Sequence, residues 1–189
     1  MIKIAVVGDI GSGKSHIAKL FGHPVFNADQ EVANIYKKNK NCFRRLKKNL
    51  PKYFSIFPAN KIQIIKAIED SEKNLEKITK IIHPEIRKKL SFFLKKNKKR
   101  RAIVLDIPLL LENKLNQKSD IIVFVQSKKS EIVKRLKKRD NFNLNLYKRF
   151  KKMQLPLSYK KKKANHIVKN NFTNKLVKIS VKKILKEII

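Results

Sequence analysis

The stretch Gly8-Asp9-Ile10-Gly11-Ser12-Gly13-Lys14-Ser15 decides how the rest of the chain is interpreted. It fits the pattern G-x-x-x-x-G-K-[ST], and the apolar run Ile4–Val7 leads directly into it. A strand that ends in a glycine-rich turn and opens a helix is the context that this phosphate-binding pattern requires. Three of the chain's four glycines lie in these eight residues. Because glycine is so rare elsewhere in the chain, a chance match to the pattern is improbable. The stretch predicts a phosphate-binding loop.

The residue types of this loop indicate how a nucleotide would be held. Glycines let backbone N–H groups close around a phosphate without a Cβ in the way. Lys14 is expected to reach the terminal phosphates of ATP, and the Ser15 hydroxyl is expected to ligate Mg²⁺. The predicted nucleotide-binding residues are therefore Gly8, Asp9, Ile10, Gly11, Ser12, Gly13, Lys14, Ser15 and His16.

Length and composition indicate one domain of 189 residues that is long enough for a real core. The single cysteine, Cys42, excludes an internal disulfide and fits a reducing compartment. The chain begins with a strand pattern instead of a secretory signal, and no apolar run approaches the roughly 18 residues of a membrane span. We therefore expect a cytoplasmic protein without a membrane partner, as a monomer or weak homo-oligomer.

The formal net charge of +34 usually suggests nucleic acid or another anionic surface. However, only 8 of the 48 basic residues are Arg, and the lysines are spread along the whole chain. Base readout favours Arg, and no nucleic-acid-binding signature is present. We expect a solvated lysine surface and no specific nucleic-acid partner.

Apolar strand patterns alternate with helical ones along the chain. Continuous apolar runs at 2–7, 102–106 and 121–125 are typical of a parallel sheet covered on both faces, and a short strand is expected at 166–168. Residues 37–97 form a helical insertion, which Ser71 and the His83-Pro84 step divide. The lysine runs at 95–101 and 160–163 are expected in loops or exposed helix ends. The fold class is α/β with a parallel sheet.

Two carboxylates and three arginines are the further candidates for chemistry. Asp106 ends a hydrophobic strand, where nucleotide-binding folds place a carboxylate near Mg²⁺, although it could simply cap a turn. Asp29 follows the short apolar segment Val25-Phe26, which is the second expected strand. It could be a general base, or merely cap a helix. Arg135, Arg139 and Arg149 are predicted on one helical segment, where they could stabilise a transferring phosphoryl group or lie exposed.

Elimination narrows the enzyme class. A GTP-binding protein would need N-K-x-D, and the Asn-Lys pairs at 60, 113 and 174 all lack the Asp. The chain also lacks the long second domain of motor ATPases. A small-molecule kinase remains, and reasoning from the residues alone does not name its acceptor.

The order and spacing of the motifs resemble those of the dephospho-coenzyme A kinase family over nearly the whole chain. Singly the motifs are weak apart from the phosphate loop, but seven of them in the right order are strong. They are 8–15; Asn27-Ala28-Asp29, similar to D-A-D; 82–87, similar to H-P-x-I-R at a helix start; 106–112, similar to P-L-L-x-E; 135–139 with the lid arginines; 149–154, similar to R-x-x-x-x-Q; and 164–170, similar to A-D-x-x-I-x-N.

The resemblance implies a three-layer P-loop kinase core with a parallel five-stranded sheet, a helical acceptor-binding subdomain (37–97) and a lid (about 135–160), all within one domain of residues 1–189. It implies transfer of the ATP γ-phosphate to the 3′-hydroxyl of dephospho-CoA, with Mg²⁺ held by Ser15 and Asp106. By the same resemblance Asp29 is the general base, assisted by Lys14 and Arg139, and Arg135 and Asn170 lie at the nucleotide. The implied acceptor residues are Asp29, His83, Arg87, Pro108, Leu109, Leu110 and Glu112.

Four residues depart from the family pattern. Asn27 and Asn165 stand where Asp is usual, Lys61 replaces an Arg that opens a helix, and His16 stands where Thr is usual. Lys61 keeps the charge but loses the bidentate fork of Arg. Two alternatives remain open: another nucleoside or nucleoside-monophosphate kinase, and a nucleic-acid-binding P-loop ATPase suggested by the charge.

Overall fold

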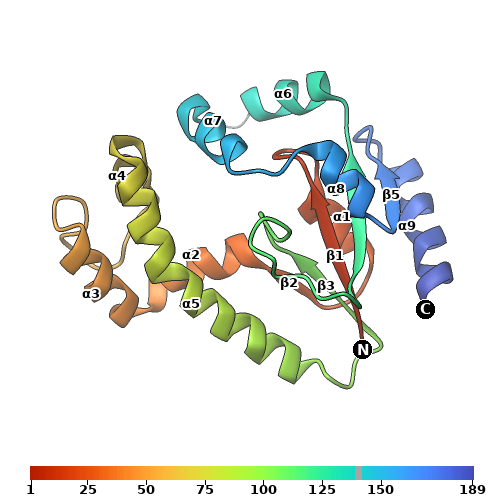
Figure 1. Cartoon of the computed structure of the whole chain (residues 1–189), viewed down its shortest axis with the longest axis horizontal. Helices are drawn as coiled ribbons and strands as arrows, with labels where there is room; N and C mark the ends of the chain where they lie inside the picture. The colour runs from red at the N-terminus through yellow and green to blue at the C-terminus, as the bar shows by residue number, and fades with distance from the viewer. Residues whose placement is uncertain (139–141) are drawn as a thin grey trace. The chain divides into compact units, whose positions relative to one another are not determined.

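The computed structural model describes residues 1–138 and 142–189. Its residues divide into two compact units (Figure 1). Unit 1 consists of Met1–Asn27 and Lys96–Ile189, and unit 2 consists of Ala28–Lys95. Unit 2 covers all but the last two residues of the predicted helical insertion 37–97, and it also includes the helix that precedes it.

Unit 1 is built on one sheet of five parallel strands, which confirms the predicted fold class. The strand order is β2-β3-β1-β4-β5, so the N-terminal strand lies in the middle. In the register of β1, Ala5 is paired with Leu105 on one side and with Ile122 on the other. The strands are β1 (Ile2–Gly8), β2 (Val25–Asn27), β3 (Ala102–Asp106), β4 (Ile121–Gln126) and β5 (His166–Lys169).

The core of unit 1 follows from the continuous apolar character of its strands. Ile4, Val6, Val104 and Val123 belong to one buried cluster, to which α1 and α9 also contribute residues. Residues of the alternate set, such as Ala5 and Ile103, are fully buried as well. Since successive strand residues face opposite sides, the sheet is covered on both faces, as its sequence predicts.

Among the described residues, unit 1 has five helices. The first helix, α1, follows the glycine-rich loop directly. The last helix, α9, packs against α1 through the buried cluster described above. A third helix, α8, packs against β1 and β4. Their bounds are α1 (Lys14–Leu20), α6 (Lys129–Lys137), α7 (Leu144–Lys152), α8 (Leu157–Lys163) and α9 (Asn174–Ile188).

One expectation for the region 129–163 is wrong, and a second holds for three of its four residues. Arg135 and Arg149 lie on different helices, α6 and α7, because Asn143 caps a new helix by accepting a hydrogen bond from the Leu146 amide at 3.0 Å. The lysine run 160–163 ends α8, but Lys160 is buried at 2% exposure instead of being solvated. Arg139 lies outside the described residues.

The regular secondary structure of unit 2 consists of helices. Asn60 begins the third of its helices with a capping box, in which it exchanges hydrogen bonds with Gln63. The helices are α2 (Ala28–Lys38), α3 (Lys40–Asn49), α4 (Lys61–Asp70) and α5 (Glu72–Lys96), the last of which ends one residue beyond the unit.

The helix α5 runs through the His83-Pro84 step, which corrects the predicted division and helix start there. Ser71 does separate α4 from α5, as expected. Pro84 removes one backbone hydrogen bond, at a cost of about 3 kcal/mol in a helix interior. The helix continues because Ile78, Ile82 and Ile86 are buried on both sides of Pro84, and burial of each such side chain contributes about 1.5–3 kcal/mol.

Candidate active site

The phosphate loop, Gly8–Ser15, connects the end of β1 to the start of α1, as predicted. Gly13 immediately precedes α1 with φ 91°, a left-handed conformation that other residues rarely adopt. A Cβ at Gly13 would lie 2.4 Å from the Asn170 amide nitrogen, and a Cβ at Gly8 would lie 2.8 Å from the Val125 carbonyl oxygen. These two positions therefore require glycine for close packing as well as for conformation.

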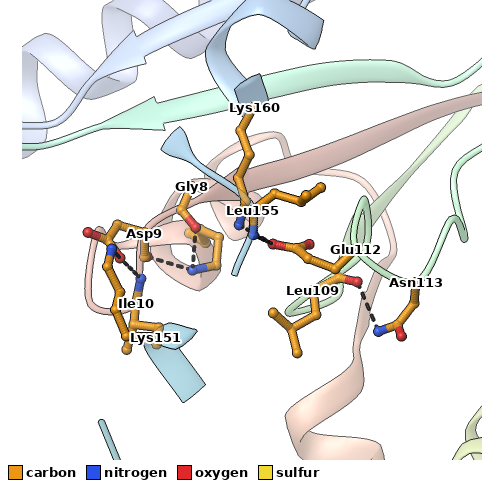
Figure 2. Close-up of polar contacts among 10 residues, drawn as sticks. Gly8, Asp9, Ile10, Leu109, Glu112, Asn113, Lys151, Leu155 and Lys160 are labelled. Atoms are coloured by element: carbon orange, nitrogen blue, oxygen red, sulfur yellow. Dashed lines mark hydrogen bonds and ion pairs between the residues drawn. The ribbon is translucent and has the colours of Figure 1, made fainter. Parts of the chain in front are cut away.

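Lys14 lies folded over the loop from which it projects. Its ammonium donates to the carbonyl oxygen of Asp9 at 2.7 Å and to that of Gly8 at 3.4 Å (Figure 2 draws both acceptor residues). An ammonium at this position is within reach of any phosphate that the loop encloses. The role of Lys14 at the terminal phosphates stays a prediction.

Two side chains hydrogen-bond to the phosphate loop at the carbonyl oxygen of Ser12. The Asn170 side chain donates to it at 2.8 Å, and the Ser127 hydroxyl donates at 3.0 Å. Asn170 is buried at 4% exposure, and its own side-chain oxygen accepts from the Phe172 amide. The structure therefore brings Asn170 to the phosphate loop, where its contacts hold the loop's shape. Ser127 was not singled out from sequence, since a lone serine after a strand carries no signal.

Two further predicted nucleotide residues lie around the same turn. The Arg135 guanidinium carbon is 4.4 Å from the centroid of the Phe172 ring, a cation–π contact. His16, in the first turn of α1, makes a 2.9 Å side-chain hydrogen bond to Asn174 at the start of α9. Arg135 is exposed at the end of α6, so its guanidinium remains accessible to a ligand.

Asp106 lies at the carboxyl end of β3, next to the strand that leads into the phosphate loop. It is buried at 2% exposure. The Asn27 amide donates to its Oδ2 at 2.5 Å, and the two residues are register partners in β2 and β3. With an amide at position 27, the partner of Asp106 is a neutral donor instead of a second carboxylate. This contact gives the Asn27 departure a physical role.

The turn after β3 contains the predicted acceptor residues Pro108, Leu109, Leu110 and Glu112. Leu109 has φ 58°, and Leu110 is buried beneath the turn. The Glu112 carboxylate accepts from the Leu155 amide at 3.0 Å and pairs with the Lys160 ammonium at 2.6 Å (Figure 2). Both side chains of this ion pair are nearly buried. Glu112 thus binds the segment between α7 and α8.

Unit 2 carries the remaining predicted acceptor residues. Asp29 lies in the first turn of α2 and is exposed. His83 and Arg87 lie one helical turn apart on α5. Burial, and secondarily the Arg87 guanidinium, lower the pKa of His83 from its ordinary 6.5. His83 is therefore neutral at neutral pH and can accept a hydrogen bond through one ring nitrogen.

Of the two remaining departures from the family pattern, Asn165 has a structural explanation and Lys61 has none. The Asn165 side-chain oxygen accepts from the Ile122 amide at 2.8 Å, a role that an amide fills as well as a carboxylate. Lys61 is the first residue of α4. Neither residue alters the phosphate loop.

Sequence reasoning missed the two lysines that join α7 and α8 to the site. The Lys151 ammonium lies 2.5 Å from Asp9 Oδ1, and Lys160 pairs with Glu112. A cavity of about 210 Å³ lies beside Asp9 and is lined further by Ser127, Ser158 and Lys161. Lysine is so abundant in this chain that no single one stands out in the sequence.

Within residues 1–138 and 142–189, no three His, Cys, Asp or Glu side chains are grouped so as to hold a metal ion. Over the same residues, no helix has the length and apolar character that a membrane span would need.

Known proteins resemble the chain along nearly its whole length. A family model described as dephospho-CoA kinase matches residues 2–175. A dephospho-CoA kinase of Wolbachia pipientis wMel is 32% identical, over 96% of this chain and 95% of its own length. A crystal structure from Thermus thermophilus has a TM-score of 0.80 at 25% identity, covering 100% of this chain and 98% of its own. Dephospho-CoA kinase from Campylobacter jejuni, at 21% identity and TM-score 0.67, covers 98% and 96% and shares the fold.

Proposed function

The chain belongs to the dephospho-CoA kinase family, and we propose a role for each of its site residues in the kinase reaction. It is a kinase that phosphorylates dephospho-CoA to coenzyme A with ATP as donor. The observation that carries the proposal is the complete phosphate loop at the end of the central strand, with the Lys14 ammonium folded onto it. In the proposed step the 3′-hydroxyl oxygen of the acceptor forms a bond to the γ-phosphorus of ATP. The bond from that phosphorus to the β–γ bridging oxygen breaks, ADP leaves, and the hydroxyl proton passes to a base.

The nucleotide side of the reaction is assigned to the phosphate loop and the residues behind it. Backbone amides of Gly8–Ser15 bind the phosphates, and Lys14 neutralises charge on the γ-phosphoryl group. Asn170 keeps the loop in shape through Ser12. Arg135 and Arg139 are the proposed guanidinium groups near the nucleotide, a role that suits their planar, delocalised charge.

Mg²⁺ is proposed at Ser15 and Asp106. A hydroxyl and a carboxylate are the hard oxygen donors that Mg²⁺ prefers, and this ion is commonly held by one or two protein groups together with substrate phosphates. The buried carboxylate of Asp106, oriented by the Asn27 amide, fits that requirement. When bound, the ion supplies charge neutralisation on the transferred phosphoryl group.

The acceptor residues are proposed from the family pattern. Asp29 is the proposed general base that removes the proton of the 3′-hydroxyl as the new bond forms. His83 and Arg87 bind the acceptor, with Arg87 suited to its phosphate groups. The turn Pro108–Glu112 completes the acceptor residues, and Glu112 fixes that turn to the segment 155–160.

The environment of the protein is part of the same proposal. We place it in the cytoplasm, acting on small molecules as a monomer or weak homo-oligomer. Its +34 charge concentrates anionic substrates near the surface, which is a field effect that needs no dedicated nucleic-acid site.

A nucleotide-release assay tests the proposal. ADP formation is measured with ATP, Mg²⁺ and one acceptor at a time: dephospho-CoA, adenosine or AMP, with DNA as a separate addition. We expect turnover that depends on dephospho-CoA, with coenzyme A identified by mass. Lys14→Ala is the control against a contaminating kinase, and it should lose about 100-fold or more of the turnover. Turnover with adenosine, AMP or DNA in place of dephospho-CoA would contradict the proposal.

A further inference from the structure

Asp9 places a carboxylate within a loop that binds anions. It is the second residue of the phosphate loop and is buried at 7% exposure. Its Oδ1 accepts from the neighbouring Ile10 amide at 2.7 Å. An uncompensated negative charge at this position would repel the phosphates of ATP, and the repulsion would be strong because the site is largely shielded from water.

Lys151 supplies the opposite charge from a distant part of the chain. Its ammonium lies 2.5 Å from Asp9 Oδ1, and the side chains of Lys151 and Asp9 are 36% and 10% exposed (Figure 2). Lys151 stands in the last turn of α7, where a cation also interacts favourably with the helix dipole. The ion pair therefore joins the end of α7 to the phosphate loop.

The segment that follows α7 is fixed independently. Leu155, four residues after Lys151, donates its amide to Glu112, and Lys160 pairs with the same carboxylate. These contacts hold the chain just beyond α7 against the turn after β3. Lys151 therefore reaches Asp9 from a segment that Glu112 holds in place at Leu155 and Lys160. This restraint reduces the conformational entropy lost when the ion pair forms.

We propose that Lys151 is a positioning residue for the kinase reaction: it neutralises Asp9 and fixes α7 on the phosphate loop, so that ATP meets a neutral pair instead of a carboxylate. The inference rests on the proposed function, since it concerns ATP at this loop. A different role, in which Lys151 itself contacts the phosphates, makes the opposite prediction for a double variant.

The test is ATP affinity, measured by direct titration without acceptor, for Lys151→Met, Asp9→Asn and the double variant. Lys151→Met leaves the Asp9 carboxylate unpaired, and we expect ATP binding to weaken about tenfold or more. Asp9→Asn keeps an oxygen for the Ile10 amide and removes the charge. We therefore expect that adding Lys151→Met to Asp9→Asn changes ATP affinity by no more than about threefold, in contrast to the loss that Lys151→Met causes alone.

The matched control is Lys152→Met, which removes an exposed lysine from the same helical turn. Its ATP affinity should be unchanged, which separates the Asp9 contact from a general loss of positive charge. Thermal unfolding of each variant shows whether it is folded before it is titrated.

Three outcomes would overturn the inference. A double variant as weak as Lys151→Met would show that Lys151 contacts the nucleotide itself. Asp9→Asn alone weakening ATP binding tenfold would make the carboxylate a ligand group, and an unchanged Lys151→Met would leave the pair without a role. Failure of the proposed function is distinguishable, because the titration needs no acceptor: ATP would bind as expected while dephospho-CoA remained unphosphorylated.

Discussion

Asp29 and Asn27 stand two residues apart at the junction of β2 and α2, but their chemistry separates them. An amide cannot accept and keep a proton as a carboxylate can. Asn27 is already engaged as a donor to Asp106. We therefore predict that Asp29→Asn lowers the turnover number about 10²- to 10⁴-fold, the usual share of a general base, and leaves ATP affinity nearly unchanged.

Steady-state kinetics with dephospho-CoA, together with a separate ATP titration, checks this prediction. Asn27→Ala is the comparison variant, and it should cost less in turnover and act mainly on the Michaelis constant of the acceptor. Near-normal turnover in Asp29→Asn would remove it as the base. Asp106 would then be the remaining candidate, or a loose phosphoryl transition state that needs no protein base.

The lowered pKa of His83 makes a prediction about acid stability. Below about pH 6.5 the unfolded chain binds a proton that the folded chain binds less readily, so stability contributed by neutral His83 falls as the pH falls. Between about pH 7.5 and 5, the melting temperature of the unmodified protein should drop more than that of His83→Asn. His16→Asn, which removes an exposed histidine, is the control variant. Parallel pH profiles for all three proteins would contradict the prediction.

Residues that carry a pattern could be predicted, and residues that act through distant contacts could not. Gly8–Ser15 stood out because glycine is rare in this chain and the motif has fixed spacing. Asp106 stood out as a charge at the end of an apolar strand. Lys151 reaches a partner 142 positions away, and no periodicity or spacing records such a contact.

The same distinction applies to helices and strands. Strands were predictable because each is a short apolar run between polar segments, and β1, β3 and β4 lie where those runs are. Helix boundaries were less predictable. Proline ordinarily ends a helix, but α5 continues through Pro84, because tertiary burial of its isoleucines outweighs a local preference.

The buried ion pair of Glu112 and Lys160 should behave as one stabilising element between α8 and the turn after β3. Removing one member leaves the other charge buried and unpaired, so Lys160→Met and Glu112→Gln should each cost about 3 kcal/mol or more of unfolding free energy. The double variant should cost less than the sum of the two, because no charge is left unpaired. Urea denaturation measures all three.

Lys162→Met, on the same helix but exposed, is the matched control and should change stability by less than about 0.5 kcal/mol. Additive losses in the double variant would mean that the two side chains do not stabilise the fold as a pair. The comparison is informative even for weakened proteins, since it depends on the difference between variants.

At the scale of the whole molecule, the dispersed positive charge predicts binding of polyanions without selectivity. A net charge of +34 releases counterions from DNA or heparin on contact, so affinity should fall steeply between about 50 and 200 mM salt. Fluorescence anisotropy with DNA duplexes of different sequence measures both the salt slope and the selectivity. Tight, sequence-selective binding at physiological salt would contradict this prediction and favour a nucleic-acid function.

The position of β1 at the centre of the sheet has a consequence for biosynthesis. Ile2 pairs with Ala102, and Ile4 pairs with Ile121, so β1 must wait for partners that are translated about a hundred residues later. At about 5–20 residues per second, that wait lasts roughly 5–20 s. Unit 2, Ala28–Lys95, is contiguous and emerges whole in the meantime.

The nascent chain therefore carries an unpaired apolar strand, Ile2–Val7, beside a helical unit that has already left the ribosome. Such a strand is a template for pairing with other chains until its own partners arrive. The lysine-rich remainder gives the growing polypeptide a like charge that keeps neighbouring chains apart. Translation order thus leaves β1 without its sheet partners for about a hundred residues of synthesis, and electrostatic repulsion between nascent chains opposes its pairing with other chains until then.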